Sequence, residues 1–368
     1  MSLARKNIFQ DKTRFALSTA CVSLAIMLIL VLNGLLNGVY LQASSYLDHA
    51  PGSVMVTQSG VKNALSGSSL LPPGTLEKVR QAEGVGQVIP VVLQAVILEL
   101  HQKKVFVFLV GYDEASGGGP WKLVQGHEPE QEEEAVLDRV QAEQHNLKLG
   151  DNFEILGNRF KISGFSEGSL TWMTSFVFIR KTAAEKLLQV PGATSFLFVN
   201  PGKEVQPRTL QARLQSLPLA GTEVLLKSEV SENDRQLFTK AFTAPLVLMV
   251  WIAFLVGSLI VGLVIYTSTL ERQREYGVLK AIGAPNRLLY RVVTTQALMA
   301  AGTGALTGVG LAWLAARLIE TIRPQFTVAL EPLAVVQALL LGVGMALLAA
   351  LVPVRFVTRL APAEIFRK

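Results

Sequence analysis

Cysteine is nearly absent from this chain of 368 residues, since Cys21 is the single one and lies inside an apolar stretch. One cysteine forms no disulfide within the chain and offers no second thiolate to a metal. The sequence therefore excludes a fold held together by disulfides. A domain outside the cell would have to rely on an apolar core, which about 200 residues can supply.

Motifs for catalysis and nucleotide binding are lacking as well. The four histidines are scattered, and His127-Glu128 has no second histidine at the spacing of a zinc-binding helix. The glycines at 117–119 are not followed by the Lys-Ser/Thr pair of a P-loop. The acidic residues of 128–134 lie in one polar segment, which is typical of a solvated loop. We therefore expect no enzyme activity, no metal and no bound cofactor in this chain.

Charged residues are missing from four long stretches, at residues 15–47, 241–270, 292–316 and 332–354. Each exceeds the roughly 20 residues that a helix needs to cross the hydrocarbon core, where one charge costs about 2.5–3.5 kcal/mol. We predict transmembrane helices at 15–40, 244–267, 292–316 and 334–354. The first is too long for the apolar part of a signal peptide and lacks a clear cleavage site, so we interpret it as an uncleaved anchor.

Lysine and arginine are unevenly distributed along the chain. Residues 41–243 hold 19 Lys+Arg and 22 Asp+Glu, whereas the rest of the chain holds 15 and 6. The excess lies in residues 1–14, 268–291 and 355–368, and the short loop 317–333 has little of it. The positive-inside rule places those three segments in the cytoplasm, and the loop and residues 41–243 outside. No basic stripe interleaved with aromatics appears, so we expect no nucleic-acid binding.

Residues 41–243 have the pattern of a mixed α and β domain. Strands are predicted at 53–58, 88–100, 105–111, 153–156, 159–165, 176–180, 194–199 and 222–226, and helices at 75–82, 135–146, 182–188 and 205–215. Gly157-Asn158 suits a two-residue hairpin loop. The apolar segment 169–176 is interpreted as an inward-packing edge strand, with a partner-contacting loop as the alternative. The predicted fold is thus a membrane protein of four transmembrane helices with a mixed α/β extracytoplasmic domain between helices 1 and 2.

Helical stalks are expected to join this domain to the membrane. The second apolar stretch is preceded by the helical pattern of residues 231–242, and Ser231 with Asp234 is close to a capping box. A continuous helix over 231–267 is our candidate lever. Pro245 is its candidate hinge, although prolines in membrane helices are often tolerated without a role.

The segment 270–285, LERQREYGVLKAIGAP, has the pattern of an amphipathic helix with charges of alternating sign. Tyr276, Leu279 and Ile282 form its predicted apolar side. Gly283 can take the left-handed conformation that ends a helix, and Pro285 cannot continue one. The residues alone leave two interpretations open, a helix that faces lipid and a helix that faces a partner protein.

This segment resembles the motif after the second span of MacB/FtsX-like ABC transporter permeases. The resemblance extends to the ending VPVRFVTRLAPAEIFR at 352–367 and to the start ARKNIFQDKTR at 4–14. HNLKLGDNFEI at 145–155 with GNRFKISG at 157–164 is similar to the family's small β-rich outer subdomain, whereas residues 54–134 match only loosely.

The resemblance implies that the loop is a coupling helix seated in a groove of a separate ABC ATPase, which binds the ATP and Mg. The implied coupling residues are Glu271, Arg272, Arg274, Glu275, Gly277, Lys280 and Gly283. It also implies a second permease copy, most simply in a homodimer. The small residues Thr303, Gly304, Thr307 and Gly308 suit packing within the chain as well as between copies.

The function implied is mechanotransmission in a bacterial cytoplasmic (inner) membrane, with both termini cytoplasmic. ATP hydrolysed by the partner would move the outer domain, which exports or extrudes a lipid, lipoprotein, peptide or drug, with a membrane-fusion adaptor as a further partner. The alternative is a non-transporting FtsX-like complex that regulates a cell-wall hydrolase or another extracytoplasmic partner. A receptor-like membrane protein without an ATPase is the third hypothesis.

Overall fold

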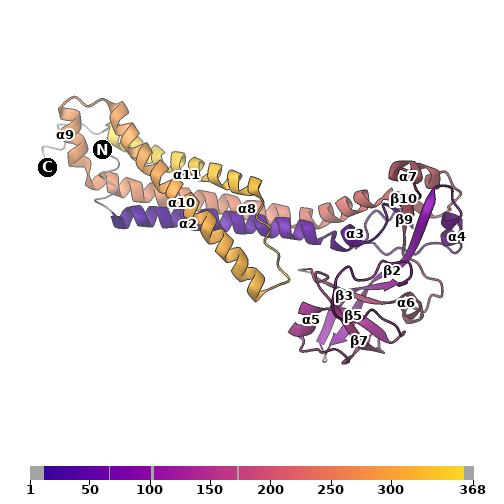
Figure 1. The fold of residues 1–368 in the computed structure, drawn as a ribbon. Helices are drawn as coiled ribbons and strands as arrows, with labels where there is room; N and C mark the ends of the chain where they lie inside the picture. The colour runs from indigo at the N-terminus through magenta and orange to yellow at the C-terminus, as the bar shows by residue number, and fades with distance from the viewer. Residues whose placement is uncertain (1–11, 66, 101–102, 172–173, 360–368) are drawn as a thin grey trace. The chain divides into compact units, whose positions relative to one another are not determined.

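A computed structural model describes residues 12–65, 67–100, 103–171 and 174–359 (Figure 1). The chain divides into two compact units. The helical unit joins the residues up to Gly38 to those from Phe242 onward, and the inserted domain is Val39–Ala241. The predicted cytoplasmic segment 1–14 and the end of the C-terminal tail lie largely outside the described residues.

Four long apolar helices form most of the helical unit. They are α2 (Lys12–Gln42), α8 (Lys227–Glu271), α10 (Asn286–Ile322) and α11 (Pro332–Arg359), and the short α9 (Gln273–Ala281) lies between α8 and α10. Each of the four long helices has an apolar part long enough to cross a membrane. The predicted fold class is confirmed, because the described residues include four such helices and a mixed α/β domain lies between the first and the second.

Small residues allow α10 to approach α2 closely. A Cβ atom on Gly304 would lie 2.6 Å from Cβ of Val22, and one on Gly308 would lie 2.8 Å from the carbonyl oxygen of Ser23. The Ser23 hydroxyl lies 3.0 Å from the Gly304 carbonyl oxygen and donates to it. The small residues Gly304 and Gly308 therefore serve packing within the chain.

A second close approach holds the connection between α10 and α11. The amide of Ala329 donates to the Gly34 carbonyl at 2.9 Å. A Cβ on Gly38 would lie 1.8 Å from the carbonyl oxygen of Thr327, so only glycine fits there. Gly34 and Gly38 thus form a groove in α2 in which the non-helical segment 327–329 lies.

The inserted domain contains one ten-stranded sheet among its described residues. Its strands are β1 (Val54–Gln58), β2 (Val85–Leu100), β3 (Lys103–Tyr112), β4 (Leu123–Gly126), β5 (Glu134–Asp138), β6 (Asn152–Ile155), β7 (Asn158–Ser166), β8 (Ser175–Arg180), β9 (Phe196–Pro201) and β10 (Thr222–Leu226). Its helices are α3 (Ser45–His49), α4 (Thr75–Arg80), α5 (Arg139–Gln144), α6 (Lys181–Leu188) and α7 (Pro207–Gln215). The strand order is β10-β1-β9-β2-β3-β8-β5-β7-β4.

Pairing of β6 with both β2 and β7 closes part of this sheet into a ring of β2, β3, β8, β5, β7 and β6. Side chains alternate along its strands because successive residues point to opposite faces. In β3, Val107 and Leu109 belong to one buried cluster, whereas Phe108 and Val110 belong to another with Tyr46 of α3. Two separate cores therefore flank the ring, and a third packs α4 and α7 against β1, β9 and β10.

Two local predictions in this domain are wrong. The expected helix over 135–146 is a strand, β5, followed by the shorter α5. Its first residues are fully buried between β7 and β8, and the Asp138 carboxylate accepts a hydrogen bond from the Val140 amide and so caps α5. The hairpin loop is Leu156-Gly157, because Ile155 pairs with Asn158 and both loop residues have positive φ.

The start of the second stalk also differs from the prediction. α8 begins at Lys227, so Ser231 lies inside the helix and caps nothing. Asp234 is fully buried and accepts hydrogen bonds from the amides of Ala64 and Leu65. The local pattern assigned the Asp234 carboxylate to a helix start, but it makes long-range hydrogen bonds instead. The continuous helix that includes 231–267 is confirmed, with Pro245 inside it.

Candidate functional site

The segment between α8 and α10 contains most of the residues that the sequence singled out. α8 ends at Glu271, and Arg272 takes φ −95° and ψ 13° before α9 begins at Gln273. The Arg272 guanidinium lies 3.8 Å from the Glu275 carboxylate, whose side chain is 64% exposed. Because the Glu275 carboxylate is solvated and lies 3.8 Å from the guanidinium, the pair contributes at most about 1 kcal/mol. Its main effect is to orient the bend.

Tyr276 anchors α9 on the helical unit. It is 3% exposed and belongs to the same buried cluster as Ile265 of α8 and Leu289 and Val293 of α10. Gly277 is buried beside it, and Leu279 packs partly against the cluster. Burial raises the pKa of Tyr276 above its ordinary value, so the hydroxyl stays protonated at neutral pH.

The opposite side of α9 is exposed. Arg274, Glu275, Val278, Ala281 and Ile282 share it, at the spacing that places residues on one face of a helix. Val278 is 43% exposed and Ile282 is 77% exposed. This face therefore presents two opposite charges beside apolar side chains.

The predicted apolar side of α9 is wrong for Ile282. At about 3.6 residues per turn, six positions leave Ile282 roughly a third of a turn away from Tyr276. Ile282 also follows the last residue of the helix, with φ −80° and ψ 0°. It therefore points away from the cluster that buries Tyr276.

Gly283 ends α9 as predicted. Its φ is +92°, which glycine adopts without strain. The amides of Gly283 and Ala284 donate to the carbonyls of Lys280 and Leu279 at 3.0 Å each, which satisfies the end of the helix. Pro285 then precedes the first residue of α10. α9 is thus a short helix with a defined bend at each end, anchored on one side only.

Two family models together match most of the chain. A MacB-like periplasmic core domain matches residues 15–217, and an FtsX-like permease C-terminal domain matches residues 247–362. The first covers more than half of the chain. The chain belongs to the MacB/FtsX-like family of ABC transporter permeases.

Relatives in this family share modest sequence identity with the chain. An uncharacterised ABC transporter permease of Mycobacterium tuberculosis is 28% identical over 315 residues, which is 84% of each chain. Another from the same species is 25% identical over 363 residues, covering 99% of this chain and 98% of the relative. The crystal structure of the periplasmic region of MacB from Actinobacillus actinomycetemcomitans aligns with a TM-score of 0.39 at 14% identity, covering 51% of this chain and 94% of that one.

The predicted coupling residues of this permease occupy different environments. Arg274 and Glu275 lie on the exposed face of α9, and Glu271 is exposed at the end of α8. Gly277 is buried, so it serves the close packing of α9 rather than a surface. The other three are the largely buried Arg272, the half-buried Lys280 and the terminal Gly283. The exposed Val278 and Ile282 join this face, although neither was predicted as a coupling residue.

A polar network in the inserted domain of the permease was not predicted. Arg235 of α8 donates through Nε to the Ser44 hydroxyl and through Nη2 to the Asp48 carboxylate, each at 2.7 Å. Its guanidinium lies 5.0 Å from the ring centre of Tyr40, whose hydroxyl donates to Glu232 at 2.8 Å. We call these residues (Tyr40, Ser44, Asp48, Glu232 and Arg235) the stalk network. It joins α8 to the end of α2 and to α3.

Proposed function

We propose that this permease docks a separate ABC ATPase on the exposed face of α9. Family membership supports a partner ATPase. The single observation that carries the proposal is the two-sided character of α9, with Tyr276 buried in the helical unit and Arg274, Glu275, Val278 and Ile282 exposed. Opposite charges beside apolar side chains suit a specific protein surface better than a lipid one, because a lipid-facing helix separates the two kinds of residue more fully.

The proposed mechanism transmits movement of α9 into the helices next to it. Tyr276 shares one cluster with Ile265 of α8 and Leu289 of α10, so a displaced α9 must carry these helices along or break the packing. α8 is one helix of 45 residues that belongs to both compact units. It is therefore the candidate lever by which nucleotide-driven closure of the ATPases changes the inserted domain.

We place α9, the residues before α2 and those after α11 on the cytoplasmic side of a bacterial cytoplasmic membrane, and the inserted domain outside. The proposal follows from the basic residues that flank α9 on both sides and from the nearly neutral inserted domain. The permease would act as a homodimer. It would export or extrude a lipid, lipoprotein, peptide or drug without hydrolysing ATP itself.

Charge reversal at Glu275 tests the docking face. Glu275→Lys should lower co-purification of the partner ABC ATPase at least tenfold, because it removes one attractive charge and adds a repulsive one. Glu83→Lys in the inserted domain is the matched control, since that side chain is 90% exposed and far from α9 in sequence. Undiminished recovery with Glu275→Lys, in a protein of unchanged thermal stability, would refute the docking site.

A further inference from the structure

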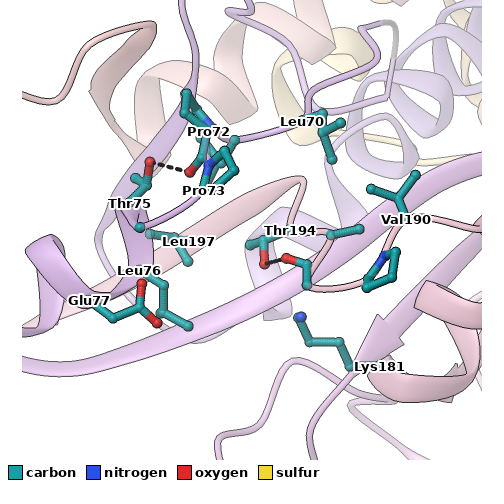
Figure 2. Close-up of a pocket in the computed structure, with 15 residues that line it drawn as sticks. Leu70, Pro72, Pro73, Thr75, Leu76, Glu77, Lys181, Val190, Thr194 and Leu197 are labelled. Atoms are coloured by element: carbon teal, nitrogen blue, oxygen red, sulfur yellow. Dashed lines mark hydrogen bonds between the residues drawn. The ribbon is translucent and has the colours of Figure 1, made fainter.

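A cavity of about 330 Å³ lies between two loops of the inserted domain. One wall consists of residues 70–77, which are the loop before α4 and its first three residues. The other consists of residues 190–194 between α6 and β9, with Lys181 from the start of α6 (Figure 2). Cavities that bind small molecules have volumes from about 300 Å³ upward, with mostly apolar walls and few polar groups. This cavity has both properties.

The walls are apolar and preformed. Leu70 and Val190 are 48% and 38% exposed, and Leu197, which also lines the cavity, is fully buried. The amide of Leu71 donates to the Thr194 carbonyl at 2.9 Å and so joins the two walls. A ligand would therefore meet an existing apolar surface and would not have to order a loop.

The threonine hydroxyls of the two walls already donate hydrogen bonds to backbone carbonyls of the walls. Thr75 Oγ1 donates to the Pro72 carbonyl at 2.7 Å, and Thr194 Oγ1 donates to the Gly192 carbonyl at 3.4 Å (Figure 2). A ligand that needs hydrogen-bond donors must find them elsewhere in the cavity.

Lys181 supplies those donors. Its ammonium points toward the space between Leu76 and Thr194 (Figure 2), and its side chain is 15% exposed. Lys181 forms an ion pair with Glu185, whose other oxygen accepts a hydrogen bond from the Gly192 amide at 2.9 Å. An ammonium has three donors, so two remain for a ligand. Among the residues that line the cavity, Lys181 is the basic one and Glu77 the acidic one, so an anionic ligand must place its charge at the Lys181 end.

We propose that this cavity binds a small apolar carboxylate. The carboxylate accepts hydrogen bonds from Lys181, and the hydrocarbon part packs between Leu70, Leu76 and Val190. The apolar walls favour the body of such a ligand, and the single ammonium with donors to spare favours its anionic end.

The same cavity is linked to α8 through residues that come shortly before its first wall in the sequence. Asn233 Nδ2 of α8 donates to the Lys62 carbonyl at 3.0 Å, and the buried Asp234 accepts from the Ala64 amide at 3.1 Å. A few residues later, Ser69 Oγ donates to the Ser195 carbonyl at 2.6 Å, next to the second wall. We infer that occupancy of the cavity and the position of α8 influence each other. This step, unlike binding itself, rests on the proposed function.

Photo-crosslinking tests the binding site. The full chain in lipid nanodiscs is labelled with octanoate that carries a diazirine, and the labelled peptides are mapped by mass spectrometry. We expect label on residues 70–77 or 190–197. An excess of unlabelled octanoate during photolysis should prevent this labelling, and an excess of octylamine should not. Lys181→Met should lower that label about tenfold, because a charge-assisted hydrogen bond is lost.

Two further variants control for folding. Lys186→Met changes an exposed lysine of the same helix that does not line the cavity, and it should keep the label. Leu70→Asp leaves the Lys181–Glu185 pair intact, and it should lose the label because it places a like charge in the opening. Label confined to the apolar helices, or equal displacement by octylamine, would overturn the proposal.

A second readout separates binding from coupling. Octanoate should change the ATPase rate of the complex of this permease with its ATPase, and Asn233→Ala should abolish that response while keeping the crosslink. A response unchanged in Asn233→Ala would overturn the link to α8. A crosslink found without any associated ATPase would leave the binding site standing and would refute the proposed function instead.

Discussion

At the scale of single residues, Tyr276 is the side chain that holds α9 against α8 and α10. Removing a buried aromatic ring from a packed cluster costs about 3–5 kcal/mol, which exceeds what the Arg272–Glu275 pair, solvated at its Glu275 end, can contribute. Tyr276→Ala should therefore release α9, and hydrogen exchange of the amides at 273–281 should accelerate at least tenfold. Tyr276→Phe keeps the ring and should exchange like the natural protein. Equal protection in all three proteins would show that α9 is held by something else.

Asp138 makes the stability of the inserted domain depend on pH. Its side chain is 1% exposed and accepts hydrogen bonds from the Val140 amide and from both the amide and the hydroxyl of Ser169. Burial is the largest influence and raises the pKa of Asp138 above its ordinary 3.8. The folded state thus binds a proton at a pH where the unfolded chain has lost it. The contribution of Asp138 to the free energy of unfolding is full below pH 3.8 and falls as the pH rises through the folded-state pKa.

The difference between the natural protein and Asp138→Asn isolates this contribution. Asparagine keeps an oxygen acceptor but does not titrate, so the other carboxylates affect both proteins equally. Urea unfolding is followed by the fluorescence of Trp121 in proteins whose other three tryptophans are replaced by phenylalanine. It should show that the protein with Asp138 loses stability relative to the variant as the pH rises from 4 toward 7. A difference that is constant with pH, or that grows in the opposite direction, would contradict the assignment.

At the scale of elements, the groove of Gly34 and Gly38 holds the connection between α10 and α11. A side chain at Gly38 would occupy the position of the Thr327 carbonyl. Gly38→Leu should therefore displace residues 327–329, and a cysteine introduced at Thr327 should react faster with a water-soluble maleimide. Gly302→Leu on α10 is the matched control, because nothing lies within 4 Å of its Cβ position. Reaction rates that rise equally in both variants would argue against the groove.

The elements that could be predicted from the sequence are those fixed by local physics. A charge-free stretch must form a helix in hydrocarbon because its backbone groups find no other partners, so the four long helices follow from the positions of Arg14, Lys240, Arg291 and Glu331. β10 was predicted with its observed bounds, and the pairing of β2 with β3 follows from two adjacent β-rich runs.

The errors at β5 and at Asp234 come from contacts between distant parts of the chain. β5 has the local pattern of a helix, and its strand conformation results from pairing with β7 and β8 on either side. Asp234 has the pattern of a helix cap and instead binds amides 170 residues earlier. The stalk network joins residues up to 195 positions apart, namely Tyr40 and Arg235. No pattern within a short window contains such pairs, whereas the α9 motif lies within 16 consecutive residues and was visible.

At the scale of the whole molecule, the proposed mechanism requires that force in α8 reaches the inserted domain. In the stalk network, an ion pair joins α8 to α3. Arg235 Nη2 lies 2.7 Å from the Asp48 carboxylate, and the two side chains are 24% and 37% exposed. Arg235→Met keeps most of the length of the side chain but removes both hydrogen bonds and the charge. It should leave binding of the ATPase intact, because α9 is unchanged.

The same variant should uncouple the two units of the permease. In the natural complex, trapping the ATPase with ATP should change the pattern of limited proteolysis within residues 39–241, because the lever would reposition the strands that α3 contacts. In Arg235→Met that ATP-dependent change should disappear. Arg213→Met is the matched control. It also breaks an arginine–carboxylate contact of the inserted domain, since Arg213 lies 3.7 Å from Glu83, but Arg213 is on α7 and not on α8. If proteolysis of Arg235→Met still responds to ATP as the control does, α8 transmits its movement by another route. Residues 62–65, which bind Asn233 and Asp234, then become the contact to test.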